Sequence, residues 1–208
     1  GSGDRGTAYG ISADGTIIFQ NETGLWLGQS STPPGFPRGC DITFASTNIY
    51  ITAQGWMWSP SREFGAYIQK LDPQTGTRLW GNYTNLDTRD TIAGYYPDAK
   101  VPLIARDGYL YAAWADKRDG DYDVFLQKVN ITNGTHPAGW ETDKKVNITA
   151  TGDQLYPDIA FKQTTGSIYV VWKDTTTGEL KLMEYKSDGS GRNFGSDVVL
   201  SGVSGTPY

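Results

Sequence analysis

The sequence predicts an all-β fold, namely a β-propeller of about four blades, each a four-stranded antiparallel sheet. The first observation is a repeat, because Trp56, Trp114 and Trp172 follow one another at intervals of 58 residues. The second is composition: 26 Gly, 10 Pro and many aromatic residues favour short strands between turns, and no long window has helical periodicity. A fixed period of this size is typical of propellers and solenoids, in which each unit buries its apolar faces against its neighbours.

A strand-like phrase recurs at the same interval. Residues 67–72 (Tyr-Ile-Gln-Lys-Leu-Asp) align with residues 125–130 and again with residues 183–188. The resulting units predict one propeller domain over residues 1–208, with blades at approximately 7–38, 39–95, 96–155 and 156–208.

Each blade is expected to contain four strands joined by polar turns. In the unit from residue 96 to 155 the expected strands are 100–104, 109–114, 123–129 and 145–149, with turns at 107–108 and 133–134. In the next unit, Ile168, Val170 and Trp172 point to one side of a strand and Tyr169 and Val171 to the other. A strand that is apolar on both sides is expected to lie between two neighbouring sheets.

The sequence begins and ends inside the repeat pattern, which leaves three arrangements open. The chain closes as a four-bladed ring, an edge strand pairs with the next molecule to give a polymer, or the sequence is part of a larger propeller. The opening Gly1-Ser2-Gly3-Asp4 is unlike a native start and is expected for a processed or excised chain.

Charge and hydropathy exclude two classes of partner. The net charge is -5, which argues against a nucleic-acid binder, since these carry a basic surface. No segment approaches the roughly 20 apolar residues needed to cross a bilayer, so direct membrane insertion is not expected.

Five of the eight Asn residues stand in Asn-x-Thr sequons: Asn21, Asn82, Asn130, Asn133 and Asn147. The excess predicts an extracellular or cell-surface protein that carries N-linked glycans. Thr-rich strands beside Asn-rich turns also bring these residue types together without any glycan. The single Cys40 excludes an internal disulfide and slightly favours a reducing compartment.

Asp41, Asp98 and Asp158 each stand at the start of an expected inner strand. Carboxylates there could line the central channel and bind a ligand, and glycoside hydrolysis needs two carboxyl groups roughly 5–10 Å apart. Because the three residues repeat in every unit, capping of backbone N–H groups is the favoured interpretation.

A cluster of carboxylates occurs in one unit only. Asp116, Asp119, Asp121 and Asp123 surround Gly120 and could offer oxygen ligands to Ca²⁺. The spacing is not that of an EF-hand loop, and Asp-Gly is also a common hairpin turn.

No catalytic constellation stands out. His136 is the only histidine, so neither a nucleophile triad nor a Cys/His zinc site has support. Trp residues at the 58-residue period are expected in the core, whereas Trp58 breaks the period and is a candidate ligand-binding residue.

The run from Trp114 to Gln127 follows the pattern Trp-x-Asp-x-Arg-x-Gly-x-x-Asp-aliphatic-aromatic-x-Gln. It resembles the blade repeat of secreted and cell-surface propeller proteins of bacteria and archaea. Residues 40–208 share this resemblance, which implies the fold and says little about activity. A weaker similarity relates residues 67–80 to the repeat of quinone-dependent dehydrogenase propellers.

Together these features predict a non-catalytic extracellular module with a structural or adhesive role. It would associate with itself, as in a surface layer, sheath or filament, or bind other surface proteins or glycans. The alternative is a carbohydrate-binding protein or glycoside hydrolase that uses the propeller channel.

Overall fold

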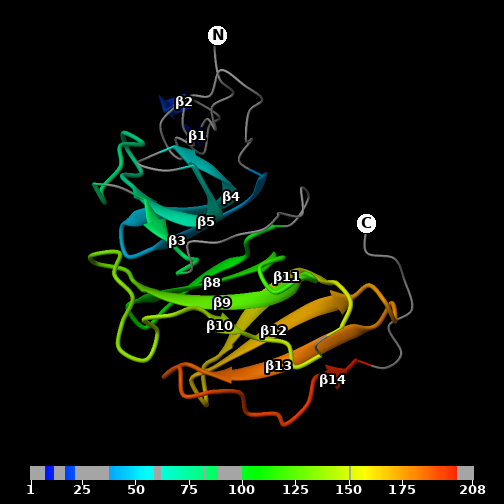
Figure 1. Ribbon diagram of the computed structural model, residues 1–208. Coiled ribbons are helices and arrows are strands. Elements are labelled where there is room, and N and C mark those ends of the chain that lie inside the picture. Colours follow the sequence, from blue (N-terminus) through cyan, green and yellow to red (C-terminus); the bar gives the residue numbers. More distant parts are fainter. Residues whose placement is uncertain are drawn as a thin grey trace.

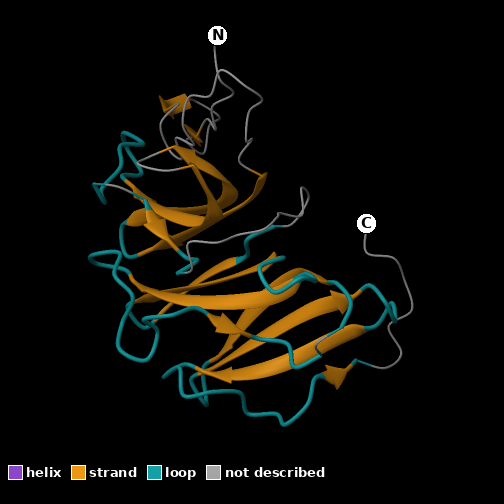
Figure 2. Cartoon of the chain, in the orientation of Figure 1, coloured by secondary structure: helices purple, strands orange, loops and turns teal. Residues whose placement is uncertain are grey.

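A computed structural model shows a chain built from strands and turns (Figure 1). It describes residues 8–11, 17–21, 38–58, 62–81, 83–88, 100–149 and 151–200. Strands and connecting loops account for this part of the chain, which contains no helix and hence no helix able to span a membrane (Figure 2).

The strands form one two-stranded sheet and three four-stranded antiparallel sheets. The two-stranded sheet pairs β1 (Ala8–Ile11) with β2 (Ile17–Asn21). The next sheet contains β3 (Arg38–Ala45), β4 (Asn48–Trp58), β5 (Arg62–Leu71) and β6 (Thr84–Asn85). The third contains β7 (Leu103–Arg106), β8 (Tyr109–Asp116), β9 (Asp123–Asn130) and β10 (Lys144–Lys145). The fourth contains β11 (Gln154–Lys162), β12 (Ser167–Asp174), β13 (Leu180–Lys186) and β14 (Val198–Val199).

The three larger sheets follow one another in space in the order of the sequence (Figure 1). One apolar cluster, which includes Tyr50, Ile68 and Trp114, fills the space between the β3–β6 and β7–β10 sheets. A second cluster, which includes Leu126 and Trp172, fills the space between the β7–β10 and β11–β14 sheets. Consecutive up-and-down sheets packed face to face are propeller blades, so the predicted all-β propeller fold is confirmed.

Two of the three periodic Trp residues, Trp114 and Trp172, belong to these cores, as predicted. Trp114 and Trp172 are fully buried, and their indole N–H groups donate to Asp116 Oδ2 and Gln154 Oε1 over 2.9 and 2.7 Å. The side chain of Trp56 lies outside the described residues. A buried indole needs such an acceptor, because an unpaired N–H in the core is costly.

The β7 strand is shorter and starts later than the sequence predicted. The carbonyl of Val101 accepts a bond from Thr52 Oγ1 over 2.6 Å, and the N–H of Leu103 donates to Asp41 Oδ2 over 2.9 Å. Side chains of the preceding sheet therefore hold this segment, and Pro102 has no N–H to give to a ladder. The expected turn at 107–108 is present, with positive φ at both Asp107 and Gly108, as a two-residue hairpin requires.

Strand register corrects the 58-residue alignment at the third strand of the fourth sheet. Ala113 pairs with Leu126, and its counterpart Val171 pairs with Leu182. The turn between the bonded residues Asp174 and Glu179 is two residues shorter than the turn between Asp116 and Asp123. The alignment of residues 125–130 with 183–188 is therefore wrong by two residues, a shift that keeps each side chain on the expected face.

Candidate functional site

Each four-stranded sheet has a Tyr on its second strand that pairs with a residue on its third strand. The two side chains of each pair lie on the face that points along the stack toward the next sheet. The pairs are Tyr50–Lys70, Tyr111–Lys128 and Tyr169–Glu184.

In the first junction, Lys70 and Tyr50 hold the turn of the next sheet. Lys70 Nζ and the hydroxyl of Tyr50 donate to the carbonyl of Ile131 over 3.4 and 3.3 Å. The indole N–H of Trp80 donates to the neighbouring carbonyl of Thr132 over 3.3 Å. Three donors from one sheet thus pair the free carbonyls of a turn in the next.

The second junction repeats this arrangement. Lys128 Nζ donates to the carbonyl of Ser187 over 2.9 Å and lies 3.9 Å from the centre of the Tyr109 ring. The fully buried Trp140 donates its indole N–H to the same carbonyl over 3.2 Å. Burial lowers the pKa of Lys128, and the charges of Asp188 and Asp107 only partly oppose this effect.

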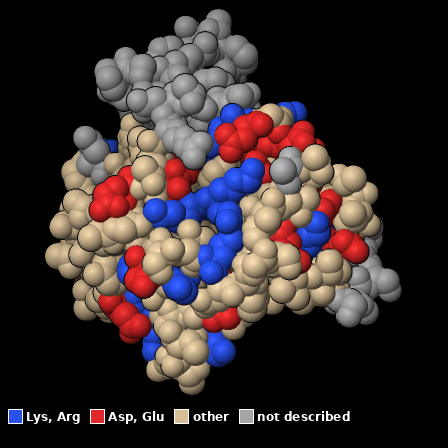
Figure 3. Space-filling view, turned by 60° about the horizontal axis from the view of Figure 1, so that its bottom comes forward, with Lys and Arg blue, Asp and Glu red and all other residues tan. Residues whose placement is uncertain are grey.

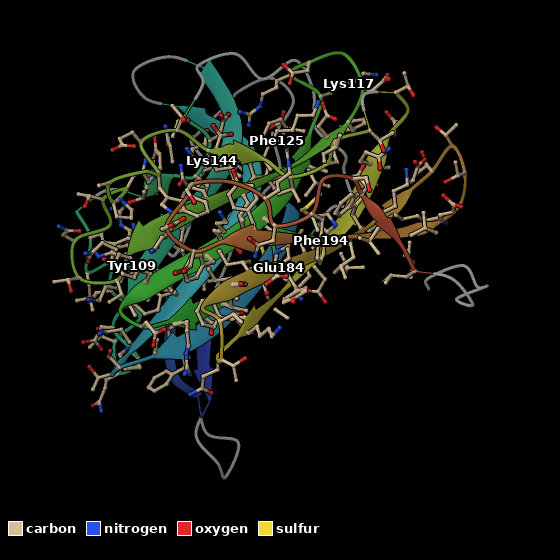
Figure 4. The ribbon with its side chains drawn as sticks, turned by 90° about the horizontal axis from the view of Figure 1, so that it is seen from below. Tyr109, Lys117, Phe125, Lys144, Glu184 and Phe194 are labelled. Carbon is tan, nitrogen blue, oxygen red and sulfur yellow. The ribbon has the colours of Figure 1, made fainter. Side chains whose placement is uncertain are left out.

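The fourth sheet differs, because the position of Lys70 and Lys128 is occupied by Glu184. Among the described residues no further sheet packs on its outer face, which we call the open face. Glu184 is labelled in Figure 4, which views the molecule from below. Half-exposed Val171 and Leu182 form the apolar middle of the open face, with Val198 beside them.

A groove of about 360 Å³ opens at one end of this face. The residues that line it are polar, charged or glycine: Thr165, Gly166, Ser167, Glu184, Lys186, Ser187, Asp188 and Asn193. Basic and acidic side chains lie interspersed on this side of the molecule, with a basic band bordered by acidic patches (Figure 3). The groove therefore offers both hydrogen-bond donors and acceptors to a ligand.

Both carboxylates of the groove are held in the ionised form. Hydrogen bonds from Ser167 and then Tyr169 lower the pKa of Glu184, outweighing its slight burial. The backbone N–H and the side chain of Ser190 lower the pKa of Asp188, and the N–H bond is 2.8 Å long. Neither group is set up as a proton donor near neutral pH.

The structure separates the channel carboxylates predicted from the sequence. Asp41 points toward the β7–β10 sheet, where it accepts the N–H of Leu103 and lies 3.4 Å from Lys100 Nζ. Asp158 lies on the open face and accepts the N–H of Ile159 over 2.9 Å. Asp98 lies outside the described residues. The positions of Asp41 and Asp158 match the capping interpretation.

The four carboxylates of the predicted calcium site do not converge, and no group of acidic, His or Cys residues in the described part of the chain is arranged to hold a metal ion. Three separate groups hold them: Arg118, Lys145 and the backbone N–H of Gly152. Asp116 pairs with Arg118, and Asp123 with Lys145 Nζ at 2.6 Å. Asp119 lies 4.0 Å from Lys145 Nζ, and Asp121 accepts the N–H of Gly152 over 2.9 Å. The prediction of a calcium site is wrong for this arrangement, because three of the carboxylates face Arg118 or Lys145 and the fourth is bonded to a backbone N–H.

Arg118 is the centre of a buried charge cluster that the sequence did not reveal. Its guanidinium pairs with Asp116 and Asp143, and lies 3.2 Å from Asp87 of the preceding sheet. The guanidinium carbon, Cζ, lies 3.8 Å from the centre of the Phe125 ring. Burial alone would lower the pKa of Arg118, but Asp116, Asp143 and Asp87 raise it. The Trp-x-Asp-x-Arg pattern was the only sign of this charge cluster in the sequence. The cluster joins two blades and does not form a ligand site.

The sequons fall in different environments. Asn133 is exposed and Asn130 half-exposed, and both side chains accept N–H groups of their own turn. Asn147 is buried: Nδ2 donates to Asp123 and to the carbonyl of Thr149, so a glycan on Nδ2 is incompatible with this packing. Asn82 and the side chain of Asn21 lie outside the described residues.

Two further candidates are not part of the groove. The side chain of Trp58 lies outside the described residues, although its backbone belongs to β4. His136 is half-buried, with Nε2 2.9 Å from the carbonyl of Asn85, and burial lowers its pKa. Glu184 escaped the sequence analysis because it was aligned two positions away from its true counterpart, Lys128.

No protein-family model matches the chain. No curated protein matches it either. Solved structures with a similar fold include the α-L-arabinofuranosidase from Lactobacillus brevis, at 14% identity and a TM-score of 0.44, covering 82% of this chain and 59% of that one. The exo-1,5-α-L-arabinanase from a bovine ruminal metagenomic library has 13% identity and a TM-score of 0.41, covering 79% and 55%.

BamB from Moraxella catarrhalis is similar at 12% identity and a TM-score of 0.36, covering 86% of this chain and 54% of that one. This chain thus spans little more than half the length of these three structures. They are β-propellers. Because one fold serves many functions, similarity this distant transfers no activity to this chain.

Proposed function

We propose that this chain is a non-catalytic, extracellular binding module of propeller type, and that the open face of the β11–β14 sheet is its binding surface. This keeps the adhesive role predicted from the sequence and its resemblance to cell-surface propellers. The exposed sequon at Asn133 and the half-exposed one at Asn130 support export and N-glycosylation.

The observation that carries the proposal is the exchange of Lys for Glu at one position of the repeat. Lys70 and Lys128 donate to a turn carbonyl of the following sheet, whereas Glu184 can only accept. By register the corresponding turn residue of the β3–β6 sheet is Pro73. A second copy stacked in the same way would set the Glu184 carboxylate against the Pro73 carbonyl, which is repulsive. The open face therefore favours a different partner over self-stacking.

The described carboxylates do not favour the glycoside hydrolase alternative. Hydrolysis requires one carboxyl group that remains protonated as a general acid, with a raised pKa. The pKa values of Glu184 and Asp188 are lowered instead. Asp41 and Asp158 are engaged with backbone N–H groups at separate places.

A retention assay tests the proposal. Beads coated with neutral polysaccharide (arabinan, xylan or cellulose), with heparin or with polylysine are incubated with the wild type, with E184K and with the control E179K. Glu179 lies beside the β12–β13 turn of the same sheet, away from the groove. We expect one bead class to retain the wild type and E179K and to release E184K, with no reducing sugar formed.

Retention that does not distinguish E184K from E179K would overturn the proposal. Steady release of reducing sugar from any polysaccharide by the wild type would also overturn it, because it would show catalysis.

A further inference from the structure

We propose that the groove at the end of the open face binds a neutral oligosaccharide. This inference names the ligand class of the proposed binding surface and rests on that proposal. The groove volume of about 360 Å³ lies at the lower end of the range of ligand pockets and suits one or two sugar rings.

The chemistry of the lining matches hydroxyl groups. Glu184 and Asp188 supply acceptors, while Lys186 and Asn193 supply N–H donors. The hydroxyl of Ser167 donates to Glu184 and accepts from Thr165 Oγ1 over 3.0 Å, which helps to hold the acceptor carboxylate in place. A sugar ring presents several hydroxyls that each donate and accept, so it can satisfy neighbouring donors and acceptors at once. A ligand of one charge sign would face side chains of its own sign as well as of the opposite sign in this lining.

The charges of the groove favour a neutral ligand. The two carboxylates are balanced by Lys186 within the groove and by exposed Lys162 beside it, 5.8 Å from the centre of the Tyr169 ring. Because side chains of both signs line the groove, it favours neither an anionic nor a cationic polymer.

Tyr169 adds an aromatic surface. Its ring is half-buried on the open face, and its hydroxyl is bonded to Glu184, which fixes the carboxylate. An aromatic ring next to polar groups combines an apolar contact for the C–H side of a sugar with directional hydrogen bonds.

The far rim of the groove is held in place by the preceding sheet. Lys128 and Trp140 both donate to the carbonyl of Ser187. At Gly189, whose φ is +81°, a Cβ atom would lie 2.5 Å from the carbonyl oxygen of Gly139, so only glycine allows the two turns to approach this closely. A rim fixed before binding lowers the entropic cost of holding a ligand.

Titration calorimetry on the whole chain tests the ligand class, with xylotetraose, arabinotetraose and cellotetraose as neutral probes, and with a heparin tetrasaccharide and a lysine tetrapeptide as charged probes. We expect at least one neutral probe to bind, and Glu184→Gln and Asn193→Ala each to weaken it about tenfold or more. The control Glu179→Gln should bind like the wild type. Circular dichroism confirms that each variant is folded.

Binding of a charged probe alone would overturn the ligand class and leave the binding role of the open face intact. Equal affinity of the wild type, Glu184→Gln and Asn193→Ala for a neutral probe would overturn the groove as its site. Absence of binding to every probe, together with equal bead retention of E184K, E179K and the wild type, would overturn both proposals.

Discussion

The junction between the β7–β10 and β11–β14 sheets and the open face of the β11–β14 sheet are built on the same register but with different chemistry. In the junction, Lys128 lies opposite Tyr111 and donates to Ser187. On the open face, Glu184 lies opposite Tyr169 and lines a groove. The repeat thus keeps its aromatic scaffold while the charge of one side chain reverses.

The difference teaches that a repeat position is informative where it departs from its copies. A residue that recurs and donates to the next blade is explained by the stack itself. A residue of opposite charge at that position cannot make the same bond and would repel the same partner. If this contrast is real, substitutions in the junctions should cost stability and substitutions on the open face should cost binding.

The largest effect is expected from Arg118→Met. It would leave Asp87, Asp116 and Asp143 buried without their cation, and loss of one partner from a buried ionic group costs about 3–5 kcal/mol. Urea denaturation measures the loss, with Lys117→Met as a control on the same exposed loop. A loss below about 1 kcal/mol would show that the cluster does not join the blades.

A smaller effect with a clear pH dependence is expected from Asp174→Asn. Burial raises the pKa of Asp174, but the 2.5 Å bond from Lys181 Nζ and the N–H groups of Thr177 and Thr176 outweigh it, so the pKa falls below 3.8. A lowered carboxylate pKa stabilises the fold above the unfolded value, and this stability is lost as the pH falls through the folded value.

The substitution should cost about 2 kcal/mol at pH 7. It should also flatten the loss of stability between pH 5 and pH 2 in thermal unfolding. Parallel pH profiles for the two proteins would contradict the expectation.

Lys128→Met should cost about 1 kcal/mol, because the Ser187 carbonyl keeps its bond from Trp140 and the methionine retains much of the packing on Tyr109. Its urea midpoint should fall clearly below that of the wild type. An unchanged midpoint would remove the functional contrast between junction and open face.

The smallest effect on stability is expected from Glu184→Gln, within about 0.5 kcal/mol, because the side chain is only half-buried and glutamine preserves its shape. The same variant should lose ligand binding. A loss of stability equal to that of Lys128→Met would mean that Glu184 stabilises the fold. It would contradict the proposal that the open face is a binding surface.

Sequence periodicity was sufficient for the fold. The spacing of Trp114 and Trp172 predicted two core positions, and Asp107-Gly108 predicted a hairpin that the structure confirms. These features are local or repeated, so they leave a visible pattern. The short β7 strand escaped prediction, since Thr52 and Asp41 from another sheet hold its first residues.

The candidate site could not be predicted for a related reason. Glu184 becomes informative only when the strand register equates it with Lys128, and a turn two residues shorter conceals that relation in the sequence. The acidic run from Asp116 to Asp123 led instead to a site prediction that the structure contradicts. Its density suggested a metal site, whereas Asp116 pairs with Arg118 inside the run, Asp119 and Asp123 face Lys145, and Asp121 accepts the N–H of Gly152.

Ser187 gives the molecule a property that neither region has alone. Its carbonyl belongs to the junction with the preceding sheet, and the residue itself lines the groove. A ligand that binds the groove only when Ser187 is held in this position would also favour the intact joint, so its affinity and the cohesion of the two blades would be linked. A mechanical load that parts the blades would loosen the groove and release whatever is held there, so the strength of attachment would be set by the joint behind the site.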